Sequence, residues 1–203
     1  MSLTSTITNE YLEKLYNYLE GKIIQNNDKS YFLKRILGCG IYSCVYLAED
    51  QEKNEYAIKI IKYTESNSEL KCNRKLQNED YVSKLLDDFI ININDKNFIV
   101  LVNEYLKNYI TLREYLNIMK DDKITKIDKL NKIVKNLKII LENIHGRGVA
   151  HMDFHEGNLM IDPISLEIKL IDFGECVANA REDDITFDHS LLRLIIEEII
   201  NHM

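Results

Sequence analysis

The sequence predicts an α+β fold of two lobes, with a β-rich first half and a mainly α-helical second half. Short apolar runs separated by glycines and polar turns fill the segment from residue 31 to residue 102. After Tyr105, apolar residues recur at helical spacing instead. Strands followed by helices within one chain are typical of α+β folds.

The elements follow from these patterns in chain order. We expect a helix over 7–22, strands over 32–37, 45–47 and 56–61, a helix over 69–86, and a strand pair over 89–93 and 98–102. Thr111 is a suitable N-cap for a helix to residue 119, and further helices are expected over 124–144 and 188–202. The chain then reads as one domain, 1–203, with an N-terminal helical extension (1–29), an N-lobe (30–105) and a C-lobe (106–203).

Composition narrows the function classes. The 203 residues carry a formal net charge of −7, which makes the surface a poor counterpart for nucleic acid or anionic lipid. No apolar run reaches the length of about 18 residues that a membrane span needs. The four cysteines form no C-x-x-C pair, so we expect free thiols in a reducing compartment and no structural zinc site. The expected location is the cytoplasm, or the host-cell cytoplasm if the source is a virus or an intracellular pathogen.

Two clusters in the first half could serve a phosphate-bearing ligand. Gly38 and Gly40 lie between two expected strands, where a backbone without Cβ atoms can approach phosphate groups closely. An ordinary glycine-containing hairpin turn is the alternative. Lys59 lies inside the apolar strand Tyr56-Ala57-Ile58-Lys59-Ile60. It could reach nucleotide phosphates, or it could lie at an edge or on a solvated face of the sheet.

A third cluster lies in the second half, in His151-Met152-Asp153-Phe154-His155-Glu156-Gly157-Asn158 and Asp172-Phe173-Gly174. Phosphoryl transfer requires a carboxylate that orients the attacking hydroxyl, and oxygen ligands for Mg²⁺. Asp153 suits the first role, and Asn158 and Asp172 suit the second. Taken singly, each of the three residues could instead be a turn residue or a helix cap.

These clusters together resemble the protein-kinase superfamily. The motifs G-x-G-x-x-S-x-V, A-I-K, H-x-D-x-x-x-x-N and D-F-G occur in that family's order. Residues 101–106 are similar to its hinge, and the resemblance covers roughly residues 30–200. It implies a two-lobed protein-kinase-like fold with a β-rich N-lobe and a truncated α-helical C-lobe.

The resemblance also assigns roles to single residues. Lys59 would contact the phosphates of ATP, Asp153 would be the catalytic base, and Asn158 and Asp172 would bind Mg²⁺, with Mn²⁺ as the alternative ion. Glu79 is the expected helix partner of Lys59, and Glu69 is the competing choice. Gly38 and Gly40 would cover the phosphates, with Tyr42 near the tip of their loop, and Leu37 is a further residue of the ATP site. Val45, Ala57 and Met160 would enclose the adenine, Asn103 would be the gatekeeper, and the backbones of Glu104 and Leu106 would bond to the adenine edge.

Several positions depart from the family pattern. Met152 replaces the arginine that anchors a phosphorylated activation loop, so we expect activity that does not require this phosphorylation. The same absence fits a kinase that an activating protein partner switches on. His155 replaces the usual lysine, and D-x-H-x-x-N is similar to RIO kinases and aminoglycoside phosphotransferases. His155 is expected to donate to the γ-phosphate, with simple local packing as the alternative.

The segment after D-F-G is short and lacks the A-P-E motif. Asp188 resembles the family's aspartate that braces the catalytic loop, and the sequence stops one helix later. This architecture resembles the small kinase of the KEOPS complex and minimal kinases of pathogens. An ATP-dependent serine/threonine kinase acting on proteins is the main hypothesis. The alternatives are an atypical kinase or ATPase within a complex, an aminoglycoside-type small-molecule kinase, and a nucleotide-binding pseudokinase scaffold.

Overall fold

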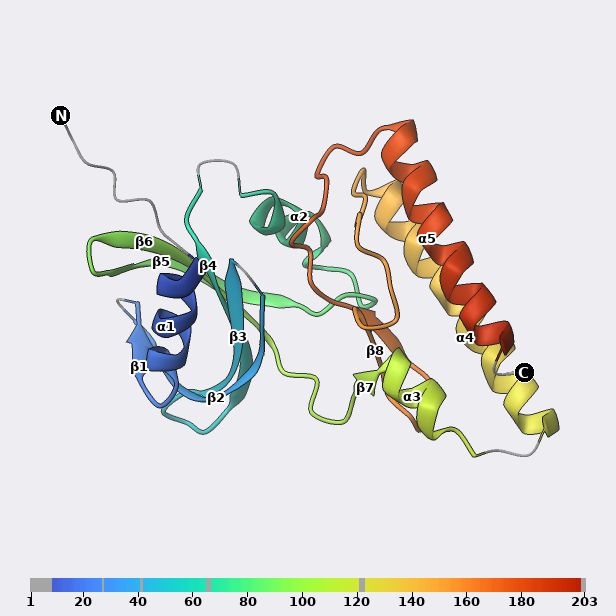
Figure 1. Ribbon diagram of the computed structural model, residues 1–203, viewed down its shortest axis with the longest axis horizontal. Coiled ribbons are helices and arrows are strands. Elements are labelled where there is room, and N and C mark those ends of the chain that lie inside the picture. The colour runs from blue at the N-terminus through green and yellow to red at the C-terminus, as the bar shows by residue number, and fades with distance from the viewer. Residues whose placement is uncertain (1–8, 27, 41, 65–66, 121–122, 202–203) are drawn as a thin grey trace. The chain divides into compact units, whose positions relative to one another are not determined.

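The computed structural model describes residues 9–26, 28–40, 42–64, 67–120 and 123–201 (Figure 1). The chain divides into two compact units. One comprises Met1–Glu65 and Leu85–Tyr105, and the other comprises Ser66–Lys84 and Leu106–Met203. The first unit holds a six-stranded sheet and the second holds most of the helices, so the predicted α+β class is confirmed.

The β-rich unit is an antiparallel sheet covered by one helix. Its strand order is β1-β2-β3-β4-β6-β5. Helix α1 was predicted over 7–22 and spans Asn9–Leu19, with residues 7 and 8 outside the described part of the chain. The short strand β1 was not expected from the sequence. The strands are β1 (Ile23–Gln25), β2 (Ser30–Cys39), β3 (Ser43–Glu49), β4 (Glu55–Lys62), β5 (Leu85–Ile93) and β6 (Lys96–Glu104).

The core of this unit lies between α1 and one face of the sheet. Leu12, Leu15, Tyr16 and Leu19 are buried at helical spacing along α1, and they join a cluster that contains alternate residues of β3, β4 and β6. The hydroxyl of Tyr46 on β3 donates to the carbonyl of Tyr16 over 2.8 Å. The N-terminal helix therefore completes the core of the β-rich unit.

The helical unit combines a small sheet with four described helices of different lengths. Its elements are α2 (Ser68–Leu76), β7 (Ile110–Thr111), α3 (Leu112–Ile118), α4 (Lys123–Gly146), β8 (Leu159–Ile161), β9 (Ile168–Leu170) and α5 (Glu182–Asn201). Strands β7, β8 and β9 pair in that order. Thr111 caps α3 as predicted, since its side chain accepts from the backbone N–H of Glu114 while the Glu114 side chain accepts from the N–H of Thr111.

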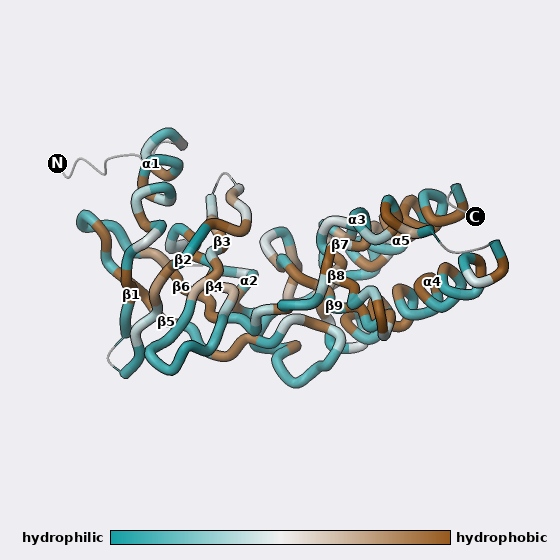
Figure 2. Tube along the Cα trace, turned by 90° about the horizontal axis from the view of Figure 1, so that it is seen from below, coloured by the Kyte–Doolittle hydropathy of each residue, from teal (hydrophilic) through white to brown (hydrophobic). Residues whose placement is uncertain are grey.

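Helices α4 and α5 lie side by side in the helical unit (Figure 1). Hydrophobic and hydrophilic residues alternate along both helices (Figure 2), because each buries one face and exposes the other. Leu137 and Ile144 on α4 and Ile195 and Ile199 on α5 belong to the same buried cluster. None of the described helices is both long and apolar enough to cross a membrane.

Two predicted helix boundaries are wrong. The helix expected over 69–86 ends at Leu76. Val82 instead pairs with Leu170 as an isolated parallel bridge, and Leu85 begins strand β5. The last helix begins at Glu182, six residues before the predicted Asp188, and the backbone N–H of Arg181 donates to the Asp184 carboxylate over 2.8 Å at its start.

The cysteines also differ from expectation. The structure pairs all four as disulfides, Cys39 with Cys44 and Cys72 with Cys176, where the sequence predicted free thiols. Cys39 and Cys44 are directly opposite each other on β2 and β3. Cys72 lies on α2, and Cys176 lies two residues after the D-F-G glycine. The first pair depends on the register of one hairpin, and the second joins residues 104 apart in sequence, so residue spacing alone revealed neither.

Candidate active site

The candidate nucleotide-binding face is formed by the central strands of the β-rich unit. The sheet register places Val45 on β3 and Leu101 on β6 opposite Lys59 on β4, and it places Asn103 opposite Ala57. Directly paired residues of antiparallel strands share a face of the sheet, as do residues two apart on one strand. Val45, Ala57, Lys59 and Asn103 therefore lie together on the face of the sheet opposite to the α1 core.

Lys59 is only 7% exposed on this central strand. An ammonium group in such a place is costly unless it is paired. Lys59 does not lie at a sheet edge, because β4 is hydrogen-bonded to both β3 and β6. The edge-strand alternative is therefore excluded.

The glycine-containing hairpin joins β2 to β3. The backbone N–H of Gly40 donates to the carbonyl of Ser43 over 2.9 Å. A Cβ atom added at Gly38 would meet no protein atom within 4 Å. Packing within the described part of the chain therefore does not explain this glycine, and the space beside it is open. Tyr42, near the tip, is 63% exposed, and its carbonyl accepts a 2.7 Å hydrogen bond from the hydroxyl of Tyr16.

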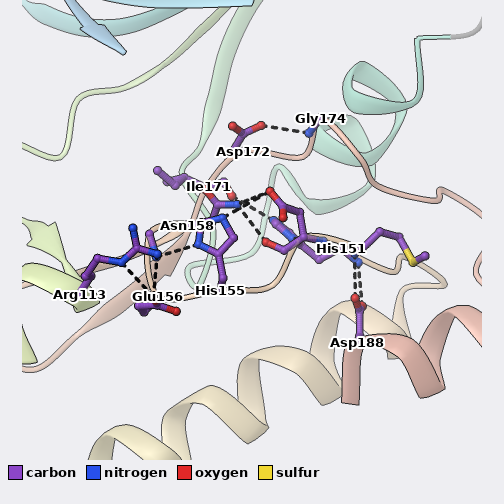
Figure 3. A network of polar contacts seen from close by, with 12 residues as sticks. Arg113, His151, His155, Glu156, Asn158, Ile171, Asp172, Gly174 and Asp188 are labelled. Atoms are coloured by element: carbon purple, nitrogen blue, oxygen red, sulfur yellow. Dashed lines mark hydrogen bonds and ion pairs between the residues drawn. The ribbon is translucent and has the colours of Figure 1, made fainter. Parts of the chain in front are cut away.

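The catalytic segment 151–158 of the helical unit is braced by Asp188 on α5 (Figure 3). The fully buried Asp188 carboxylate accepts from the backbone N–H of His151 and of Met152, each over 2.8 Å. Its Oδ2 also lies 2.9 Å from Nε2 of His145. Met152 has a φ of 66°, a left-handed conformation that few non-glycine residues adopt. Asp188 therefore holds a strained turn immediately before Asp153.

Asn158 fixes the side chain of Asp153. Its amide nitrogen donates to both the backbone carbonyl and Oδ2 of Asp153, over 2.9 Å each. The backbone N–H of Ile171 donates to the carbonyl of Asn158 over 2.9 Å, which ties this segment to the residue before Asp172. The Asp153 carboxylate is 47% exposed and can receive a proton from a bound hydroxyl.

His151 connects the same two segments from inside the core. Burial lowers the pKa of His151, so its imidazole is neutral. Its Nε2–H donates to the carbonyl of Ile171 over 3.0 Å, and its Nδ1 accepts from the N–H of Asp153 at 3.3 Å. The ring packs edge-on against Phe173, with the ring centres 5.0 Å apart. His151 therefore has a structural role.

Asn158 and Asp172 fit a magnesium ion that is shared with a substrate. Asn158 uses its amide nitrogen toward Asp153, so its amide oxygen is left as a ligand. Asp172 has a φ of 60°, and its Oδ1 accepts from the N–H of Gly174 over 3.1 Å. Within the described residues no group of three His, Cys, Asp or Glu side chains could hold a metal. Mg²⁺ typically uses one or two protein ligands together with substrate phosphates and water.

His155 and Glu156 complete the catalytic segment. Nε2 of His155 lies 3.5 Å from Oδ2 of Asp153. Arg113 on α3 donates to Oε1 of Glu156 through Nε and Nη2, over 2.9 and 2.7 Å. Burial by itself would raise the pKa of the Glu156 carboxyl, but hydrogen bonds from its own backbone and from Arg113 outweigh burial and lower that pKa. No sequence motif pointed to Arg113 or Glu156.

Glu79 was predicted to lie on a helix and to be the partner of Lys59. It lies beyond the end of α2, and its carboxylate pairs with Arg147. Its expected place on a helix is wrong because α2 ends at Leu76, and its pairing with Lys59 stays a prediction. Glu69, the competing choice, lies in the first turn of α2 and is 7% exposed.

The remaining predicted residues divide between the two units. Leu37 and Glu104 belong to the β-rich unit, on β2 and β6. Leu106 and Met160 belong to the helical unit, and Met160 is half-buried on β8. Asp153, His155 and Asn158 are brought together in one network, as the sequence order implied.

Comparisons with known proteins match this chain to protein kinases. Residues 31–190 match the protein kinase domain family. The chain is 34% identical over 154 residues to the probable serine/threonine-protein kinase 2 of Plasmodium falciparum, which covers 71% of this chain and 28% of that protein. It is 25% identical over 195 residues to the serine/threonine-protein kinase prp4 of Schizosaccharomyces pombe, which covers 90% of this chain and 40% of that protein.

A solved structure shares the fold. The kinase domain of BubR1 superposes with a TM-score of 0.61 at 16% sequence identity, over 81% of this chain and 53% of that chain. The likeness at this identity concerns the fold alone. The chain spans less than half the length of the two curated relatives.

Proposed function

We propose that this chain, which belongs to the protein kinase domain family, is a Mg²⁺- and ATP-dependent serine/threonine kinase that phosphorylates protein hydroxyls. The observation that carries the proposal is the network around Asp153. A half-exposed carboxylate is held by Asn158 in a segment that Asp188 braces. The serine/threonine kinases among the relatives support the choice of acceptor.

The proposed reaction assigns roles to the predicted residues. Bound Mg-ATP would supply the γ-phosphoryl group and neutralise its charge. Lys59 and the hairpin of Gly38 and Gly40 would hold the phosphates, and Asn158 and Asp172 would be the metal ligands. Asp153 would orient the acceptor hydroxyl and take its proton as the hydroxyl oxygen bonds to phosphorus. For the helix glutamate that would pair with Lys59, we propose Glu69, the buried glutamate of α2, in place of Glu79.

We further propose that activity does not depend on phosphorylation of the activation segment. Between Gly174 and Asp188, Thr186 is the only residue with a hydroxyl group, and it lies within α5. The segment between Gly174 and Asp188 is held instead by backbone hydrogen bonds. Ala150 and Val177 exchange backbone hydrogen bonds of 3.0 and 2.9 Å, and Ala180 donates to Gly148 over 3.0 Å.

A second set of ties joins this segment to α2. Lys75 donates to the carbonyl of Ala178 and, over 3.1 Å, to the side chain of Asn179. Cys72 is bonded to Cys176. These contacts provide the order that a phosphate–arginine pair would otherwise supply, which is consistent with Met152 in place of arginine.

The test measures phosphate transfer from labelled ATP to casein or myelin basic protein. Asp153→Asn should retain ATP binding and lose transfer by at least about 10²-fold. Glu69→Gln should impair transfer, whereas Glu79→Gln, the matched control, should not. Phosphatase treatment and Thr186→Ala should leave the rate unchanged. Full transfer by Asp153→Asn would refute the assigned base, and ATP hydrolysis without transfer would favour an ATPase that needs a partner.

A further inference from the structure

The side chain of His155 folds back over the backbone of its own loop. The N–H of Gly157 donates to Nδ1 of His155 over 2.9 Å, and the N–H of Asn158 donates to the carbonyl of His155 over the same distance. These two bonds fix both the ring and the backbone of His155 within one turn. The opposite ring nitrogen, Nε2, is thereby directed toward Asp153.

This arrangement is compatible only with glycine at position 157. A Cβ atom there would lie 2.7 Å from Cε1 and 3.0 Å from Nδ1 of His155. Real Cβ atoms essentially never approach other atoms so closely. The group that would have to move is the imidazole, which is a side chain and can rotate. A larger residue at 157 is therefore expected to displace His155 and leave the surrounding backbone in place.

The same hydrogen bond selects the tautomer of the neutral ring. Because Nδ1 accepts a hydrogen bond from the N–H of Gly157, the proton of the neutral ring must be on Nε2. Nε2 lies 3.5 Å from Oδ2 of Asp153, which is longer than a direct hydrogen bond. The Nε2–H thus lies beside the carboxylate of Asp153 but makes no hydrogen bond to it. It can therefore donate to an oxygen of a bound phosphoryl group.

We propose that Gly157 is a positioning residue for phosphoryl transfer, which acts by fixing the orientation and tautomer of His155. The inference rests on the proposed kinase function and adds a role for a residue that carries no functional group. A lysine in place of His155 would make no use of the Gly157 N–H as a hydrogen-bond donor. The need for glycine at 157 should therefore exist only while residue 155 is histidine.

A double-mutant cycle tests this dependence through kcat and through KM for ATP. His155→Ala and Gly157→Ala should each lower kcat by about 10²-fold, the effect of losing or misplacing one donor at a transition state, with KM for ATP little changed. The double variant should be no worse than His155→Ala within about twofold. In the His155→Lys background, Gly157→Ala should have no effect. Gly146→Ala is the matched control, because a Cβ atom there meets nothing within 4 Å.

Three outcomes would overturn the proposal. They are a further tenfold loss when Gly157→Ala is added to His155→Ala, an equal loss in the His155→Lys background, and full activity of His155→Ala. If any of these occurs while Asp153→Asn remains inactive, the kinase assignment stands and the positioning role fails.

A spectroscopic measurement decides the proposal without any turnover. In ¹⁵N-labelled protein the His155 imidazole, assigned by its loss in His155→Gln, should show Nε2 protonated and Nδ1 as a hydrogen-bond acceptor. Gly157→Ala should remove this signature while the circular dichroism and melting temperature stay close to those of the wild type. An unchanged ring signal in Gly157→Ala would overturn the proposal even if the wild type proved inactive.

Discussion

Asp188 offers the sharpest test of how the catalytic segment is held. Its carboxylate has no exposed surface and accepts from two backbone N–H groups, those of His151 and Met152. Asp188→Ala would leave both donors buried without an acceptor. His145, whose side chain is 8% exposed, would lose its partner as well.

The magnitude follows from these contacts. A buried donor left without a partner costs about 1–3 kcal/mol, so the two backbone groups alone give about 2–6 kcal/mol. The whole free energy of unfolding of a domain is only about 5–15 kcal/mol. The left-handed Met152 is expected to relax once its N–H is released, which would displace Asp153 and abolish transfer. Asp188→Asn keeps one acceptor oxygen and should fall between the wild type and Asp188→Ala.

The assay is urea denaturation followed by circular dichroism, with the transfer rate measured on the same samples. Asp183→Ala is the matched control, because Asp183 is an exposed aspartate in the first turn of the same helix. It should cost less than about 1 kcal/mol. If Asp188→Ala is no less stable than Asp183→Ala, the brace does not contribute to stability and the reasoning is wrong.

Two further predictions concern the cysteines and pH. The disulfide between Cys72 and Cys176 closes a loop of 104 residues, so its effect on the entropy of the unfolded chain should stabilise the fold by about 4–5 kcal/mol. The disulfide between Cys39 and Cys44 closes a loop of 5 residues and should stabilise the fold by about 2 kcal/mol. Urea denaturation of Cys72→Ser and Cys39→Ser, with and without dithiothreitol, measures both, and a wild type that is insensitive to the reductant would contradict the estimate. Burial lowers the pKa of His151 in the folded protein below its ordinary value of 6.5. As pH drops below 6.5, the histidine of the unfolded chain therefore becomes protonated before that of the folded protein. The free energy of unfolding then falls by up to about 1.4 kcal/mol per pH unit. His151→Gln should remove this part of the slope, and identical slopes in both proteins would exclude His151 as its source.

The sequence predicted those parts of the fold that local chemistry determines. The turn between β5 and β6 was placed at Asn94 and Asp95, and both have the left-handed φ angles, 51° and 59°, that suit a tight hairpin. Thr111 carried a complete capping box in its own sequence. The contact between Asp153 and Asn158 is local as well, since they lie five residues apart in one loop, and their catalytic roles stay a prediction.

Tertiary contacts determined what the sequence could not reveal. Val82 and Leu85 continue an apolar helical spacing beyond α2, yet Val82 pairs with Leu170 and Leu85 enters the sheet. Ser83 donates to the carbonyl of Leu170 over 3.1 Å, and Leu170 donates to Tyr81 over 2.9 Å. These backbone bonds with a distant strand outweigh local helix propensity. Glu79, which the family spacing favoured as the helix glutamate, therefore lies beyond the helix on which the sequence placed it.

Gly157 shows what a sequence motif leaves out. The pattern D-x-H-x-x-N counts residues by their functional groups, and a glycine inside it is an unspecified position. The role of Gly157 becomes visible only when the imidazole of His155 is seen against its N–H and against the place of its missing Cβ. Because a lysine at 155 would place no such demand on 157, the glycine follows physically from the histidine two residues earlier. Positions 155 and 157 therefore depend on each other, and neither residue can be interpreted alone.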